Sequence, residues 1–135
     1  MKKKLLIALM SLVVFLFTSC KTEVTKRADF KEVMKVHDEA MARMGEIHEL
    51  KKQVRSWADT ASNSIVNSET NEIVRKLDMA DEGMMSWMAE FKIPDGGPED
   101  ELKSYFAEEQ KKVDKVSADI EQAINNALKF LEDHK

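Results

Sequence analysis

The chain has 135 residues, a length that fits a single domain. Hydrophobic residues make up 43% of it and charged residues 34%, so it can bury a core and does not have the composition of a disordered protein. It contains one cysteine, which excludes a fold held together by disulfides within the chain.

The first nineteen residues have the features of a secretory signal peptide. Residues 2–4 are three lysines, and residues 5–17 form an apolar run interrupted only by Ser11. As a helix this run would span about 20 Å, which is shorter than the roughly 30 Å hydrocarbon core of a bilayer. We therefore predict that residues 1–19 are cleaved and do not belong to the fold.

The end of this segment resembles a lipobox, which lipoprotein signal peptidase recognises. Residues 16–20 read Leu-Phe-Thr-Ser-Cys, with Phe17 where leucine is usual. The resemblance implies that the Cys20 thiol receives diacylglycerol, that cleavage follows Ser19, and that the new amino group is acylated. The alternative is an ordinary export signal that happens to contain a cysteine. We favour lipidation because Cys20 directly follows the apolar run, and several acyl chains would hold the protein firmly on a bilayer.

Residues 20–28 are predicted to be the lipidated cysteine and a polar tether. Without the three signal-peptide lysines, the chain keeps 18 basic and 25 acidic side chains, a net charge of −7. An acidic surface disfavours nucleic acid, so the predicted partners are the membrane, through the lipid, and an envelope protein. Lys21 is not the aspartate that retains lipoproteins in the inner membrane, and only Glu23 offers the acidic charge associated with surface display. We therefore expect attachment to the outer membrane, on its periplasmic side.

Residues 29–135 are predicted to be all-α, an up-down-up antiparallel bundle of three long helices. The first helix is expected over residues 29–60, where apolar residues recur every three or four positions. Asp29 and Glu32 are predicted to form a capping box at its start. The segment 60–71 is rich in Ser, Thr and Asn, which favour turns, and predicts a reversal of the chain within this segment.

The second helix is expected over residues 66–92 and the third over 98–132. The segment 93–98, Ile-Pro-Asp-Gly-Gly-Pro, predicts the turn between them. Apolar residues of the third helix alternate steps of three and four, which is a heptad seam. Glu109 interrupts that seam. We interpret it as a position where the bundle frays, the alternative being a buried carboxylate paired with a histidine or a lysine.

Two short segments, 38–47 and 81–91, begin alike with Asp-Glu-Ala-Met and Asp-Glu-Gly-Met. A reversal near residue 63 would place them side by side at mid-height of the bundle. Together with His37 and Ala80, these segments resemble small uncharacterised Bacteroidetes lipoproteins that carry the label "viral A-type inclusion protein". The resemblance implies a helical fold and a place in the cell envelope, and it implies no chemistry.

Methionine and histidine form a stripe along the first predicted helix. Thioether and imidazole ligands on one helix face suit Cu(I) or Ag(I), which favour soft ligands. The alternative, which we prefer, is that these methionines fill gaps in a helical core. The residues of this hypothetical soft-metal site are Met34, His37, Met41, Met44 and His48, with Met84 and Met88 from the second helix.

The carboxylate pairs 38–39 and 81–82 are expected to be largely solvated, because adjacent helical residues diverge by about 100°. Catalytic and cofactor motifs are not found, so we expect a protein that is not an enzyme and has no cofactor besides the covalent lipid. The leading hypothesis is a structural or protein-interaction role in the envelope. Apolar residues that the bundle leaves uncovered would bind the partner, and the candidates are Trp57, Met85 and Tyr105.

Overall fold

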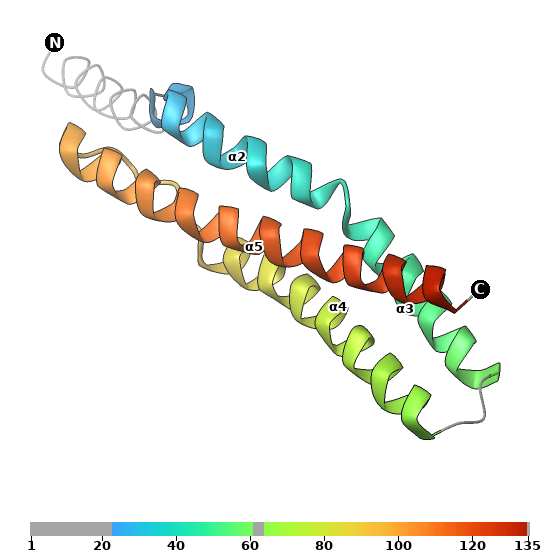
Figure 1. Ribbon diagram of the computed structural model, residues 1–135. Coiled ribbons are helices and arrows are strands. Elements are labelled where there is room, and N and C mark those ends of the chain that lie inside the picture. The colour runs from blue at the N-terminus through green and yellow to red at the C-terminus, as the bar shows by residue number, and fades with distance from the viewer. Residues whose placement is uncertain (1–22, 61–63, 135) are drawn as a thin grey trace, which may run out of the picture.

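The computed structural model describes residues 23–60 and 64–134, and it is built from helices (Figure 1). The prediction of an all-α chain is confirmed, since these residues contain no strand. Within them, no helix combines the length and the apolar character needed to cross a membrane. The predicted signal peptide and Cys20 lie outside the described residues. The four helices are α2 (Ala28–Met41), α3 (Met44–Thr60), α4 (Ser64–Glu90) and α5 (Glu99–Asp133).

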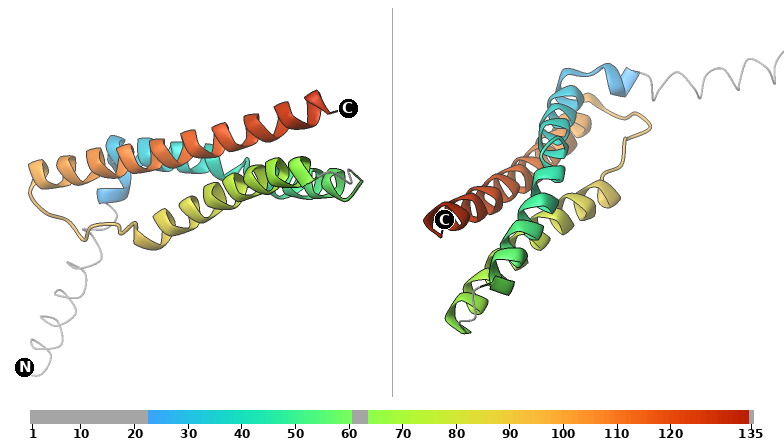
Figure 2. Two further views of the ribbon diagram at one scale, coloured as in Figure 1. Left: turned by 60° about the horizontal axis from the view of Figure 1, so that its bottom comes forward. Right: turned by 90° about the vertical axis from the view of Figure 1, so that its right-hand side faces the viewer.

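The helices pack lengthwise against one another. Helices α2 and α3 follow one another along α5, and α4 runs back beside α3 before α5 reverses direction again (Figures 1 and 2). Helix α5 is the shared element, because α2, α3 and α4 all pack against it. The reversal after the first helical arm falls between Thr60 and Ser64, which confirms the position predicted from the polar segment.

The first arm is divided, and the prediction of one unbroken helix over 29–60 is therefore wrong. Helix α2 ends at Met41 and α3 begins at Met44, with a change of direction between them (Figure 1). The backbone N–H of Arg43 bonds to the carbonyl of Ala40, one residue nearer than in an α-helix. Gly45, a poor helix former, follows immediately and weakens the helix at this point.

The heptad seam of α5 contributes a large part of the core, as its spacing predicts. The seam residues are buried except for Val116, which is partly exposed. The helix begins and ends within one residue of the predicted bounds 98–132. The apolar stripes of the other helices pack on this seam. The largest fully buried side chains are Phe106, Ile47, Leu77, Met84, Ile120, Ile124, Val33, Val54 and Val113.

Residues 91–98 connect α4 to α5, where the sequence predicts a turn. Gly96 and Gly97 have φ values of 132° and 149°, which side-chain-bearing residues rarely adopt. The hydroxyl group of Tyr105 donates a hydrogen bond to the carbonyl of Lys92. The oxygen of the same hydroxyl accepts a hydrogen bond from the backbone N–H of Lys92. Tyr105 thereby fixes the start of this connection to the first turns of α5.

The segment before α2 is more firmly attached than a free tether. Val24 is 3% exposed and belongs to the core, so the predicted tether over residues 20–28 is wrong for its second half. Arg27 donates hydrogen bonds to both Asp29 and Glu99. The predicted capping box is absent from this helix start, because the Asp29 carboxylate binds the Arg27 guanidinium and the backbone N–H of Phe30 instead.

Candidate functional site

A cluster of hydrogen-bonded polar side chains is centred on Glu109 of α5. Glu109 is 5% exposed and accepts a hydrogen bond of 3.0 Å from the indole Nε1 of Trp87 on α4. Its other oxygen lies 2.8 Å from the Lys112 ammonium, which reaches back from the next helical turn. The interpretation of Glu109 as a fraying position is therefore wrong, and the alternative of a buried carboxylate paired with a lysine is confirmed.

The predicted histidine partners of Glu109 lie elsewhere. The His37 ring packs against Trp87, with ring centroids 5.6 Å apart, and its Nδ1 is 2.8 Å from the carboxylate of Asp38. Lys112 pairs with Glu109, and this bond raises the pKa of the lysine. Glu109, Trp87 and Lys112 form a satisfied structural network, and this network presents no group positioned to attack or protonate a substrate.

The contact between His37 and Trp87 also tests the predicted pairing of the two Asp-Glu-x-Met segments. His37 lies just before the first segment, and Trp87 lies inside the second. Farther along, Phe30 stacks on Phe91 with centroids 6.4 Å apart. These contacts bring the start of the first segment near the second, but α2 packs mainly on α5, so a side-by-side pairing of the two segments stays a prediction.

Residues of the hypothetical soft-metal site are distributed between the core and the surface. Met44 and Met84 are buried, whereas Met88 is 39% exposed. Met34, His37 and Met41 are partly exposed, and His48 is exposed. The break between α2 and α3 falls in the middle of the stripe.

His48 lies apart from the buried methionines of this stripe. It is exposed and lines a surface hollow on α3 with Lys51, Lys52, Arg55, Ser56 and Asp59. No group of three or more His, Cys, Asp or Glu side chains suited to a metal occurs within residues 23–60 and 64–134. Binding of Cu(I) or Ag(I) through methionine stays a prediction.

The carboxylate pairs are solvated or structural, as expected. Asp38, Glu39 and Glu82 are exposed. Asp81 is partly buried, 3.6 Å from the Lys51 ammonium, which also binds Asp78 at 2.9 Å. Lys51 thereby links α3 to α4 by an ion pair in which its own side chain is largely buried. Of these carboxylates, Asp78 and Asp81 help to hold α3 and α4 together.

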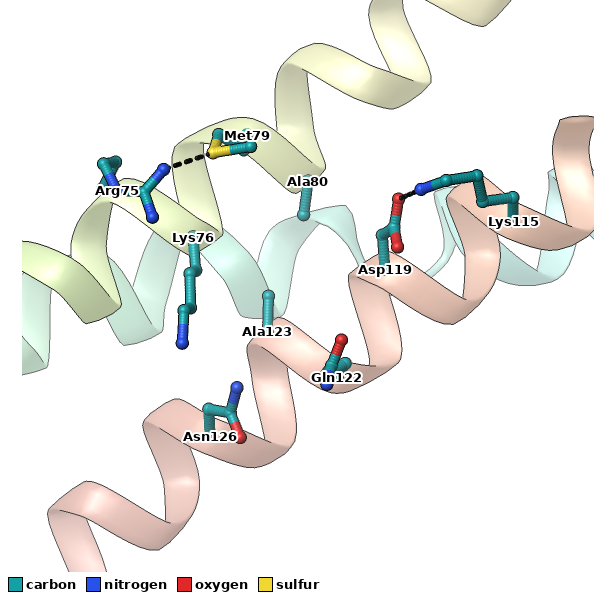
Figure 3. Close-up of a pocket in the computed structure, with 9 residues that line it drawn as sticks. All are labelled: Arg75, Lys76, Met79, Ala80, Lys115, Asp119, Gln122, Ala123 and Asn126. Carbon is teal, nitrogen blue, oxygen red and sulfur yellow. Dashed lines mark hydrogen bonds and ion pairs between the residues drawn. The ribbon is translucent and has the colours of Figure 1, made fainter.

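A hollow of about 310 Å³ lies between α4 and α5 (Figure 3). Ala80 and Ala123 form its floor, because their small side chains leave space between the helices. Its volume is at the lower end of the range for small-molecule sites, which is roughly 300–1,000 Å³. The remaining lining residues are Arg75, Lys76, Met79, Lys115, Asp119, Gln122 and Asn126.

The cations at the rim of this hollow already have carboxylate partners. Arg75 and Lys76 pair with Glu72, and Lys115 pairs with Asp119. The bond from Arg75 lowers the pKa of the Glu72 carboxyl. A ligand would have to compete with these ion pairs, so the hollow is a weak candidate for a small-molecule site.

Two of the three residues predicted to bind a partner are used inside the molecule. Trp57 packs against Phe130 with ring centroids 4.9 Å apart, and its Nε1 donates to the carbonyl of His134. Tyr105 packs on the core and binds Lys92. That prediction is wrong for both residues, and only Met85 is exposed, at 46%.

The exposed large apolar residues that the sequence prediction missed are Met79, Met88, Ile93 and Leu128. Met79 and Leu128 fall outside the apolar stripes of their helices, and Ile93 lies in the connection between α4 and α5. Comparisons with protein-family models, with curated proteins and with solved structures returned no match.

Proposed function

We propose that the protein is a lipid-anchored helical protein of the cell envelope, without catalytic activity, that acts by binding another protein. The observation that carries this proposal is the sequence Leu-Phe-Thr-Ser-Cys at residues 16–20, directly after a basic start and a short apolar run. The resemblance to small Bacteroidetes lipoproteins supports the same location. Attachment to the outer membrane, on its periplasmic side, follows from Lys21 after the cysteine.

The proposed architecture of the body is an up-down-up three-helix bundle, in which α2 and α3 together form the first arm. Chain reversals between α3 and α4, and between α4 and α5, support this architecture. A bundle of this kind keeps a long, polar, solvent-exposed surface, on which a few apolar residues stand out. Helix-face recognition of a partner commonly uses such apolar anchors.

An exposed apolar side chain of α4 supports an interaction role. Met79 is 55% exposed inside α4, three turns before the end of the helix. Methionine is flexible and polarizable, which suits surfaces that adapt to a partner. The Glu109 network is fully satisfied and the hollow between α4 and α5 is shallow, so the described residues favour binding by a surface over chemistry in a cleft.

Metabolic labelling with an alkyne analogue of palmitate tests the anchor. The wild-type protein should incorporate the label and sediment with outer membranes on a density gradient. The Cys20→Ser variant should incorporate none and should accumulate as a precursor of higher mass. Equal labelling of both proteins, or wild-type protein found free of fatty acid, would refute the lipoprotein assignment.

Site-specific photo-crosslinking in living cells tests the interaction. A photoreactive residue at Met79 should yield a discrete crosslinked protein band, and the same residue at exposed Lys111 of α5 should not. Identical patterns at both positions would show that α4 carries no specific interaction surface.

A further inference from the structure

The distance between the proposed lipid and the folded body is short. Val24 is buried in the core, only four residues after Cys20. Four residues span at most about 14 Å when fully extended. The lipidated sulfur therefore holds the end of the molecule that contains Val24 within that distance of the bilayer.

Ion pairs of Arg27 also hold this end of the molecule together. Arg27 is 17% exposed at its side chain and forms ion pairs with Asp29 at 2.7 Å and with Glu99 at 2.6 Å. Its guanidinium lies 6.0 Å from the centre of the Phe106 ring. These contacts attach the start of α2 to the start of α5, so the body has little freedom to swing about residues 24–27.

Exposed apolar residues gather at the same end. The stacking of Phe91 on Phe30 places the connection after α4 beside the first turn of α2. Figure 2 shows this connection at the end of the body where α2 begins. Ile93 is 42% exposed in the connection. Met85 and Met88 are 46% and 39% exposed and lie three residues apart in the last turns of α4.

We propose that Ile93, with Met88 and Met85, docks on the surface of the bilayer that holds Cys20. The inference rests on the lipid anchor proposed above. Scattered apolar residues are ordinary on a protein surface, but here three of them lie at the end that the short tether confines to the membrane. Their side chains enter the boundary between headgroups and acyl chains, as apolar residues of surface-bound helices do.

The exposed charges of this end are mixed. Glu90 and Asp100 are exposed near the connection, and so are Lys92 and Lys103. Docking is therefore apolar, and it does not depend on the charge of the headgroups.

The experiment uses full-length lipidated protein reconstituted in phosphatidylethanolamine–phosphatidylcholine vesicles that contain a lipid with a spin-label quencher. An environment-sensitive fluorophore is attached at Ile93→Cys, and in the control at Leu128→Cys. Leu128 is 45% exposed, which matches Ile93, but it lies 29 residues beyond Glu99, about 44 Å along α5. Quenching at position 93 should exceed quenching at position 128 several-fold, and it should stay the same when phosphatidylglycerol replaces phosphatidylcholine.

Equal, weak quenching at both positions in protein whose mass confirms the lipid would overturn the docking proposal and leave the anchor intact. Protein whose mass shows an unmodified Cys20 would refute the anchor, and docking with it. Strong quenching at position 93 that rises with phosphatidylglycerol would overturn the apolar basis of the contact.

Discussion

The indole of Trp87 and the carboxylate of Glu109 form a hydrogen bond between α4 and α5 in the interior, where each residue is only 5% exposed. A buried donor that loses its acceptor keeps the full cost of leaving water, about 1–3 kcal/mol. We predict that Glu109→Ala lowers the free energy of unfolding by about 2–3 kcal/mol, since it also leaves a void. Urea-induced unfolding followed by circular dichroism measures this loss.

The matched variant Glu109→Gln keeps an oxygen for the indole and removes only the ion pair with Lys112. The Lys112 side chain is 54% exposed, and ion pairs at the surface contribute about 0–1 kcal/mol. The free energy of unfolding should therefore fall by less than about 1 kcal/mol. A loss in Glu109→Gln as large as in Glu109→Ala would mean that the charge, and not the acceptor for Trp87, is the important property.

Arg27 gives the stability of the protein a dependence on acidic pH. Its hydrogen bonds lower the pKa values of Asp29 and Glu99 below their ordinary values of 3.8 and 4.5. A carboxyl group with a lowered pKa stabilises the folded state above its ordinary pKa and loses this effect as the pH falls through its folded-state pKa. We predict that Arg27→Met destabilises the protein near neutral pH and that the difference from wild type disappears well below pH 3.8. Thermal unfolding of both proteins at a series of pH values tests this prediction. A difference in melting temperature that stays constant with pH would contradict it.

Alanine substitutions at two glycines should change the free energy of unfolding in opposite directions. A Cβ atom added at Gly83 in α4 or at Gly97 in the connection would meet no atom within 4 Å. Gly83 is helical, so Gly83→Ala should raise the free energy of unfolding by about 0.5–1 kcal/mol. Gly97 has a φ of 149°, so Gly97→Ala should lower it by about 1 kcal/mol or more. Shifts of the same sign in the melting temperature of both variants would contradict this assignment.

Soft metal should not stabilise the folded chain. Met44 and Met84 are buried among core side chains, whereas His48 is exposed on α3. We predict that an equivalent of Ag(I) leaves the melting temperature unchanged. An increase that is present in wild type and absent from Met84→Leu would establish the soft-metal site and contradict this expectation.

The features that could be predicted from the sequence depend on residues that are close together in the chain. The seam of α5, the reversal within residues 60–71 and the turn over residues 93–98 follow from periodicity and from residues that favour turns. The break at residues 42–43 was missed because neither proline nor a polar run marks it. One hydrogen bond to Ala40 in place of the helical partner is enough to end α2.

The features that it missed depend on contacts distant in the sequence. Arg27 and Glu99 are 72 residues apart, and nothing near either residue predicts their pairing. Val24 is buried because other helices cover it, and the polar residues around it resemble a tether. Glu109 was misinterpreted for the same reason, since its partner Trp87 comes from another helix.

The division of the first arm has a consequence for how the molecule opens. Helix α3 packs on both α4 and α5, whereas the main packing partner of α2 is α5. Amide protons of α2 should therefore exchange with solvent sooner than those of α3, with the boundary at Ala42 and Arg43. The interruption thus marks the boundary at which protection from exchange changes along the first arm.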